Sequence, residues 1–223
     1  MSQPLRAIIF DLDGTLIDSA IELTAAVNGG LAHYKLPLVT VSQVKTMIGD
    51  GAMALTERAF AASGRRLNGA ALAEALEVVR VEYTSQPPSG FYPGARETLE
   101  RLAAMGLPLA VCTNKPEKAA KRILGQLGAT QLFRAIAGGD TFATKKPDPG
   151  PLQALMEQLG TSADETIMVG DGANDVIAGR IAGLFTVAVS YGYSNTPPKE
   201  LGADCLVDSL EELFTVLAGR LPA

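Results

Sequence analysis

Short apolar runs without polar alternation recur along the chain. They lie at 7–10, 107–112, 135–137, 166–169 and 185–189, with a weaker run at 205–207. A strand with one face in solvent alternates apolar and polar residues, whereas a strand covered on both faces does not. The pattern therefore predicts buried strands of a parallel sheet.

Segments with apolar residues at spacings of three and four alternate with these runs, as in helices that bury one face. They lie at 95–105, 117–127, 151–159, 174–182 and 210–218. Strands alternating with helices predict a doubly wound, Rossmann-like α/β domain with a parallel sheet and right-handed crossovers.

The segment at 17–89 breaks this alternation. It is rich in alanine and helical in pattern, and Leu36-Pro37, Gly49-Asp50-Gly51 and Ser63-Gly64 divide it into several helices. The stretch at 86–90 reads as a linker back to the α/β pattern. We therefore predict an α/β core formed by 1–16 and 90–223, with an all-helical cap domain inserted at 17–89.

Composition narrows the possible partners. Hydrophobic residues make up 47% of the 223 residues, which is enough for a sizeable core. A net charge of −5 argues against nonspecific binding to nucleic acid or to anionic membranes, although a local site can still bind an anion. No apolar stretch reaches the ~20 residues that span a bilayer, and the first residues lack a signal-peptide layout. We expect a cytoplasmic protein that binds neither nucleic acid nor membranes.

Polar side chains follow four of the predicted strands. Asp11 and Asp13 come after the first strand, and Thr113-Asn114-Lys115 follows the second. Lys145-Lys146-Pro147 comes a few residues after the third, and 170–175 (Gly-Asp-Gly-Ala-Asn-Asp) follows the fourth. Ligands of open α/β sheets bind at the carboxyl ends of the strands, so we expect these groups to converge.

These groups suit phosphoryl transfer. Clustered carboxylates repel one another unless a cation lies between them, and few hard oxygen ligands favour Mg²⁺. Asp11 would attack phosphorus and form an aspartyl-phosphate. Asp13 would protonate the leaving oxygen and then take a proton from water. A lysine and the Thr113 hydroxyl would stabilise the phosphoryl charge.

Each residue also has a plainer interpretation. Aspartates after a strand favour turns, Thr113 could cap a helix, and Asp175 could be an acid favoured by a helix dipole. The convergence of four strand ends favours the site. On these grounds Lys145 and Lys146 both remain candidates for the lysine.

The same residues resemble a known family. The stretch at 11–15 (Asp-Leu-Asp-Gly-Thr) resembles the first motif of the haloacid dehalogenase superfamily, and Thr113-Asn114 resembles the second. Lys146-Pro147 resembles the third motif, and Gly170-Asp171 with Asp175 the fourth. The match implies Asp11 as nucleophile, Asp13 as acid/base, and phosphate binding by Thr113, Asn114 and Lys146. It also implies Mg²⁺ held by the Asp11 side chain, the Asp13 backbone carbonyl and Asp171, with Asp175 in support.

The inserted helices resemble the cap of the phosphoglycolate phosphatase-like branch, above all at 46–60 (TMIGDGAMALTERAF). The resemblance implies a Mg²⁺-dependent phosphatase that hydrolyses a small phosphate monoester, most like the phosphoglycolate phosphatases. One departure is Gly49-Asp50-Gly51 in place of Gly-Asn-Gly. If Asp50 faces the pocket, its charge would disfavour a carboxylated substrate. Arg58 either touches the substrate or lies on a solvated helix face.

Three alternatives differ in class. A dehalogenase is disfavoured because Asp13 is present, whereas the dehalogenases of the superfamily lack this acid/base. A sugar phosphomutase of the β-phosphoglucomutase type shares the first motif and the cap. A non-catalytic protein that binds a phosphate ligand would be expected to lose a motif aspartate, and none is lost here.

Overall fold

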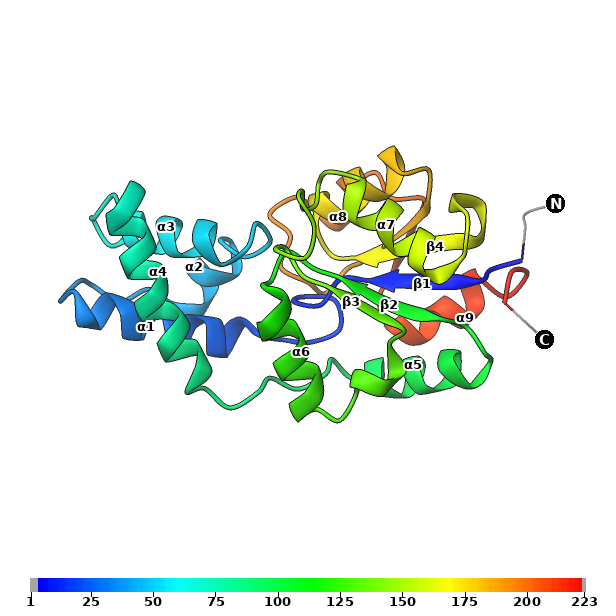
Figure 1. Ribbon diagram of the computed structural model, residues 1–223, viewed down its shortest axis with the longest axis horizontal. Coiled ribbons are helices and arrows are strands. Elements are labelled where there is room, and N and C mark those ends of the chain that lie inside the picture. The colour runs from blue at the N-terminus through cyan, green and yellow to red at the C-terminus, as the bar shows by residue number, and fades with distance from the viewer. Residues whose placement is uncertain (1–3, 222–223) are drawn as a thin grey trace.

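The computed structural model describes residues 4–221, and within them the α/β core holds a six-stranded parallel sheet (Figure 1). The strand order is β3-β2-β1-β4-β5-β6, and every neighbouring pair is parallel. The strands are β1 (Ala7–Phe10), β2 (Leu109–Cys112), β3 (Ala135–Ala137), β4 (Thr166–Gly170), β5 (Phe185–Val189) and β6 (Cys205–Val207). The predicted doubly wound α/β fold is confirmed.

Helices cover both faces of the sheet because successive strand residues point to opposite sides. Ile8 and Phe10 of β1 pack on one side, and Ile9 packs on the other. Figure 1 shows α5, α6 and α9 below the sheet and α7 and α8 above it. These helices are α5 (Ala95–Ala104), α6 (Glu117–Gln126), α7 (Gly150–Leu159), α8 (Ala173–Ile181) and α9 (Leu213–Val216).

The C-terminal helix differs from its prediction. The apolar spacing at 210–218 predicts one helix, but the structure has a 3-10 turn at Leu210–Glu212 followed by the short α9. Leu210, Leu213 and Leu217 are nevertheless all buried in the core. The spacing therefore identified the buried face, and only the helix type differs. Further 3-10 turns lie at Thr130–Leu132, Ala163–Glu165 and Pro198–Glu200.

The segment between β1 and α5 forms a helical unit beyond the carboxyl ends of the strands (Figure 1). Its helices have their own hydrophobic cluster, centred on side chains such as Val27, Leu31 and Phe60, each with no exposed surface. The helices are α1 (Ala20–His33), α2 (Val41–Lys45), α3 (Ala52–Ala62) and α4 (Gly69–Thr84). Within residues 4–221, no helix combines the length and apolar character that a membrane span requires.

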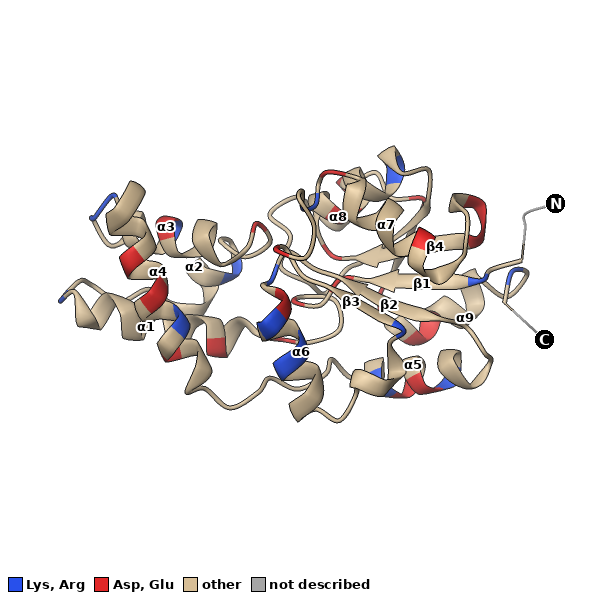
Figure 2. Cartoon of the chain, viewed as in Figure 1, with Lys and Arg blue, Asp and Glu red and all other residues tan. Residues whose placement is uncertain are grey.

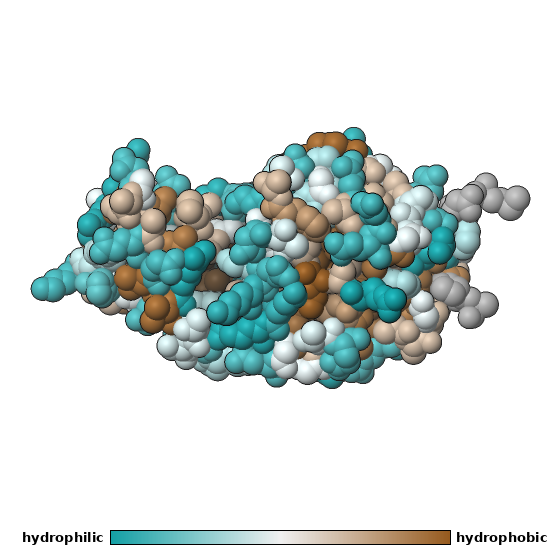
Figure 3. Space-filling model, viewed as in Figure 1, coloured by the Kyte–Doolittle hydropathy of each residue, from teal (hydrophilic) through white to brown (hydrophobic). Residues whose placement is uncertain are grey.

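The surface is mostly polar on the face shown in Figure 3, and apolar side chains appear there in small separate groups. The exposed large hydrophobic residues are likewise distributed over several helices, for example Ile21 on α1 and Ile181 on α8. Most large apolar side chains are therefore buried, either in the α/β core or in the cluster of the helical unit.

The separate cluster of the helical unit makes a prediction about stability. Phe60→Ala should lower the free energy of unfolding of this unit by about 3–5 kcal/mol, because it removes a fully buried aromatic side chain. Urea unfolding followed by circular dichroism measures this change. Met53→Ala on the same helix is the matched control, because Met53 is 54% exposed and should change stability by no more than about 0.5 kcal/mol. Equal effects of the two substitutions would contradict the independent core.

Candidate active site

Two neighbouring strands bring three carboxylates together. β1 and β4 pair in register, and the backbone N–H of Asp11 donates to the carbonyl of Val169 at 2.9 Å. Asp171 follows β4 directly, and Asp175 lies in the first turn of α8. Asp11, Asp171 and Asp175 each offer an oxygen within 4.8 Å of the others. The predicted convergence of strand ends is therefore present for these residues.

A glycine allows the loop after β1 to approach Asp171. Gly14 has a φ of +89°, and a Cβ on it would lie 2.4 Å from Asp171 Oδ2. Both the backbone conformation and the close contact therefore require glycine. Asp171 itself is fixed by two hydrogen bonds, from the backbone N–H of Tyr193 at 2.7 Å and from the Thr15 hydroxyl at 3.3 Å.

Lys146 supplies the positive charge among these carboxylates. Its ammonium lies 2.5 Å from Asp175 Oδ1 and 3.0 Å from Asp11 Oδ1, and its side chain is 2% exposed. Lys145 instead donates to the backbone carbonyl of Asp50 at 2.7 Å. The structure thus brings Lys146, and not Lys145, to the carboxylates.

The pKa values reflect the crowding of negative charge. Burial raises the pKa of Asp11 to about 6, against the opposing charge of Lys146. Burial, reinforced by the charges of Asp11 and Asp175, raises the pKa of Asp171 to about 8. Burial on its own would lower the pKa of Lys146, but the two neighbouring carboxylates raise it above its ordinary value.

These residues fit a divalent metal ion. Asp11 Oδ1 is buried and accepts no hydrogen bond from the described residues, since its contact with Lys146 has the distance but not the geometry of one. Three carboxylates lie around one ammonium, so ionisation of all three leaves net negative charge in a largely buried place. Hard oxygen ligands and uncompensated negative charge suit a cation of the Mg²⁺ or Ca²⁺ type.

The side chain of Asp13 has different partners. Its Oδ1 accepts hydrogen bonds from the Ser19 hydroxyl at 2.5 Å and from Lys115 Nζ at 2.9 Å, and its Oδ2 lies 3.0 Å from the same ammonium. Sequence reasoning gave Lys115 no role. Its place directly after Thr113-Asn114 was the available signal, because it follows the same strand end.

Thr113 and Asn114 occupy the end of β2. Both are buried, and the Thr113 hydroxyl accepts from the backbone N–H of Lys115 at 3.2 Å. The Asn114 amide donates at 2.9 Å to the carbonyls of both Gly49 and Lys146. Asn114 therefore joins the helical unit to the loop of Lys146, a linking contact that the motif did not reveal.

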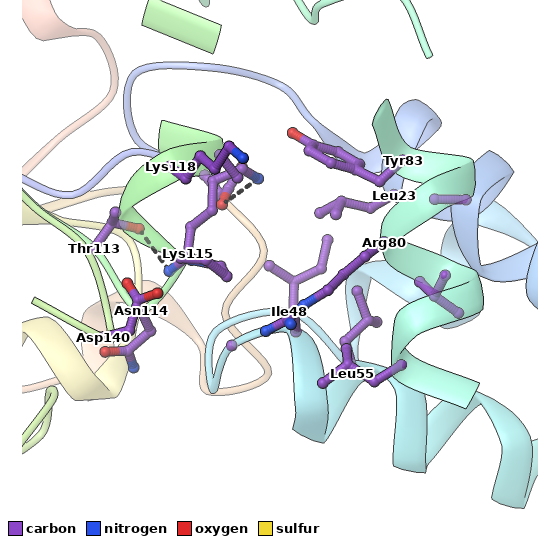
Figure 4. Close-up of a pocket in the computed structure, with 18 of the residues that line it drawn as sticks. Leu23, Ile48, Leu55, Arg80, Tyr83, Thr113, Asn114, Lys115, Lys118 and Asp140 are labelled. Carbon is purple, nitrogen blue, oxygen red and sulfur yellow. Dashed lines mark hydrogen bonds and ion pairs between the residues drawn. The ribbon is translucent and has the colours of Figure 1, made fainter. Parts of the chain in front are cut away.

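A cavity of about 420 Å³ lies between the core and the helical unit. Figure 4 shows Thr113, Asn114 and Lys115 on the core side, facing Leu23, Leu55 and Tyr83 from the helices. Asp11 and Asp13 also line it. In Figure 2, ribbon segments of acidic and of basic residues lie where the two units face each other. A small molecule in this cavity would contact the carboxylates at one end and apolar helix residues at the other.

Asp50 does not line this cavity, although its neighbours Gly49 and Gly51 do. Its carboxylate is paired with Arg58 and accepts a hydrogen bond from the Asn174 amide at 2.8 Å. Partial burial opposes ionisation, but Asn174 and Arg58 together lower the pKa of Asp50. The extra carboxylate in the loop is therefore directed away from the cavity, and Arg58 pairs with it.

Comparison with known proteins agrees with this geometry. The family model of haloacid dehalogenase-like hydrolases matches residues 8–189. A phosphoglycolate phosphatase of Rhodospirillum rubrum is 44% identical over 214 residues, covering 93% of this chain and 89% of that protein. One of Agrobacterium fabrum is 39% identical, covering 99% of this chain and 96% of that protein.

Solved structures give the same result. The crystal structure of a predicted phosphoglycolate phosphatase from Haemophilus somnus 129pt matches with a TM-score of 0.89 and 33% identity, covering 95% of this chain and 97% of that one. A β-phosphoglucomutase of Clostridium difficile matches with a TM-score of 0.80 but 20% identity, covering 97% of this chain and 96% of that one, and so shares the fold. This chain belongs to the haloacid dehalogenase-like hydrolase family.

Proposed function

We propose that this protein is a Mg²⁺-dependent phosphatase that hydrolyses a small phosphate monoester, with phosphoglycolate as the leading candidate. The observation that carries the proposal is the group of Asp11, Asp171 and Asp175 around Lys146, of which Asp11 lines the cavity between the core and the helical unit. Relatives named phosphoglycolate phosphatase, at 38–44% identity, support the choice of substrate.

Asp11 and Asp13 perform the two chemical roles in this proposal. A carboxylate oxygen of Asp11 attacks phosphorus, the bond from phosphorus to the ester oxygen breaks, and Asp13 gives a proton to the leaving alcohol. Water then attacks the aspartyl-phosphate, Asp13 takes its proton, and inorganic phosphate leaves. Thr113, Asn114 and Lys146 would bind the phosphoryl oxygens, although the Asn114 amide nitrogen already has two partners.

The metal has a specific place in this arrangement. Mg²⁺ would be held by the carboxylates of Asp11 and Asp171 and the backbone carbonyl of Asp13, with Asp175 in support. When bound, it supplies charge neutralisation for the phosphoryl group. Lys146 and the metal together would allow an anionic nucleophile to approach an anionic substrate.

The helical unit would act as a cap over the core and exclude bulk water. The contacts between its loop at 46–51 and the core support this role: Asn195 donates to the Thr46 carbonyl at 2.7 Å, and Asn114 and Lys145 bond the same loop. The pairing of Asp50 with Arg58 removes the expected objection to a carboxylated substrate. We propose 17–89 as the cap domain and the remainder as the catalytic core.

Asp11→Asn should lower kcat for phosphoglycolate by at least about a thousandfold, because the amide cannot act as the nucleophile. Phosphate release in the presence of Mg²⁺ measures this loss. Asp164→Asn is the matched control, since Asp164 is exposed before the amino end of β4 and should keep full activity. Substantial turnover by the Asp11 variant would rule out this nucleophile.

Metal binding should stabilise the protein, and more so at higher pH. Asp11 and Asp171 have pKa values raised to about 6 and about 8, so the folded metal-free protein binds more protons than the unfolded chain in this range. Its stability therefore falls as pH rises from about 4 towards 8. Mg²⁺ at a hundred times its dissociation constant should add about 2.7 kcal/mol, which corresponds to roughly 5–10 °C in Tm.

Thermal unfolding at pH 6 and pH 8, with EDTA or with Mg²⁺, measures this effect. We expect the larger Mg²⁺-dependent rise in Tm at pH 8, because protons compete less with the metal there. The same rise in the Asp171→Asn variant would show that the metal binds elsewhere.

Asp50→Ala should weaken cap closure without touching the reacting groups. The substitution removes the bonds to Arg58 and Asn174, so KM should rise by up to about tenfold while kcat changes less. Steady-state kinetics with phosphoglycolate separates the two parameters. Glu57→Ala, at an exposed position of α3 next to Arg58, provides the control. An unchanged KM for the Asp50 variant would count against the closure role.

A further inference from the structure

Lys115 is the buried cation among the side chains that line the cavity. Its side chain is 5% exposed. Arg80 and Lys118 also line the cavity but are exposed, and Arg122 is half-buried and donates to backbone carbonyls at the end of α4. A desolvated carboxylate needs a buried cation or several donors as partners. Lys115 is therefore the group in the lining best suited to bind one.

Lys115 also has capacity for a further partner. Its ammonium carries three N–H donors, and Asp13 accepts from it at two oxygens, at 2.9 and 3.0 Å. On the other side, the Tyr83 ring centroid lies 4.8 Å from Nζ. The Tyr83 hydroxyl is buried and has no hydrogen-bond partner among the described residues. A buried donor without a partner beside a cation indicates a place for an acceptor that the protein does not supply.

The surrounding charges agree with an exchangeable partner. Glu22, which is buried on α1, also interacts electrostatically with Lys115. Burial, however, raises the pKa of Glu22 and so disfavours its ionised form. The firm partner of Lys115 is Asp13, which is also the proposed acid/base. The ammonium is thus placed beside the atom at which a leaving alcohol would be protonated.

We propose that Lys115, with the Tyr83 hydroxyl as a second donor, receives a carboxylate carried one carbon from the scissile ester oxygen. This inference rests on the proposed function. An ester oxygen that faces Asp13 lies next to the ammonium, because Asp13 contacts both, so a carboxylate one methylene away reaches Lys115. The substrate carboxylate then accepts a hydrogen bond that the Lys115 ammonium otherwise donates to Asp13. An Asp13 oxygen thereby becomes available to the leaving group. Lys115 would thereby select short carboxylated alcohols over neutral ones.

The test compares two esters of the same length, phosphoglycolate and 2-hydroxyethyl phosphate, which differ in the carboxylate. Wild-type protein with Mg²⁺ should prefer phosphoglycolate in kcat/KM. Lys115→Met should lower this preference by at least tenfold, mainly through KM for phosphoglycolate, and Lys115→Arg should restore part of it. If the ion pair with Asp13 is merely structural, Lys115→Met would instead lower kcat/KM for both esters by the same factor. That result would overturn the inference and leave the phosphatase proposal intact.

Lys121→Met is the matched control, because Lys121 lies on α6, the helix that follows Lys115, outside the cavity and in an exposed pair with Glu117. It should leave the preference unchanged. Binding calorimetry in an Asp11→Asn background gives a readout that does not need turnover. There, Lys115→Met should weaken the binding of phosphoglycolate at least tenfold more than the binding of 2-hydroxyethyl phosphate. Equal weakening would overturn the inference. Absence of hydrolysis of every ester by wild-type protein would overturn the proposed function, and the calorimetric comparison would still decide the role of Lys115.

Discussion

Three closely spaced carboxylates, two of them buried, around one ammonium are the constraint on which the rest of the structure depends. Burying an uncompensated charge is costly, and Lys146 can balance one of the three. The raised pKa values of Asp11 and Asp171 are the consequence. The fold maintains this arrangement because β1 and β4 are hydrogen-bonded neighbours, and because Gly14 lets the loop after β1 lie against Asp171. In our proposal, a bound cation relieves this crowding of negative charge and helps to hold the phosphate.

The two aspartates of the first motif have different environments although they are two residues apart. Asp11 has a buried oxygen that accepts no hydrogen bond from the described residues, whereas both oxygens of Asp13 have donors from Lys115 or Ser19. Lys115, which follows β2, contacts Asp13, whereas Lys146, in the loop after β3, contacts both Asp11 and Asp175. Such unequal surroundings allow two identical side chains to perform different roles. The separation of nucleophile and acid/base in our proposal follows from this asymmetry.

Much of the fold could be predicted from the sequence because its strands are short and, apart from Thr166 and Thr186, without polar residues. β1, β3, β5 and β6 begin and end where the apolar runs do, while the run at 107–112 starts earlier than β2, since Pro108 has no N–H to donate to a sheet. Helix type near the C-terminus was not predictable, because buried leucines at the same spacing fit a 3-10 turn as well as an α-helix.

The predictable part of the site consists of residues that follow strand ends, because parallel topology places Asp11 and Asp171 at the ends of neighbouring strands. Contacts made across the cavity are different in kind. The bond between Asn114 and Gly49 joins residues 65 apart, and that between Asn174 and Asp50 joins residues 124 apart. No local pattern encodes such distances. Lys115 illustrates the limit, because its neighbours in sequence indicate a site but its approach to Tyr83 depends on how the helical unit lies on the core.

The loop at 49–51 shows why one acidic residue need not alter the charge of a binding site. Gly51 has a φ of +91°, and a Cβ on it would lie 2.8 Å from the Asn114 carbonyl oxygen. The loop therefore contacts the core through its backbone at this position. This close approach turns the Asp50 side chain to Asn174 and Arg58, outside the cavity lining. The loop therefore borders the cavity with its glycine backbone, and the charge of Asp50 is balanced by Arg58. In our proposal, discrimination between substrates then falls to side chains that do line the cavity, of which Lys115 is buried, charged and in contact with Asp13.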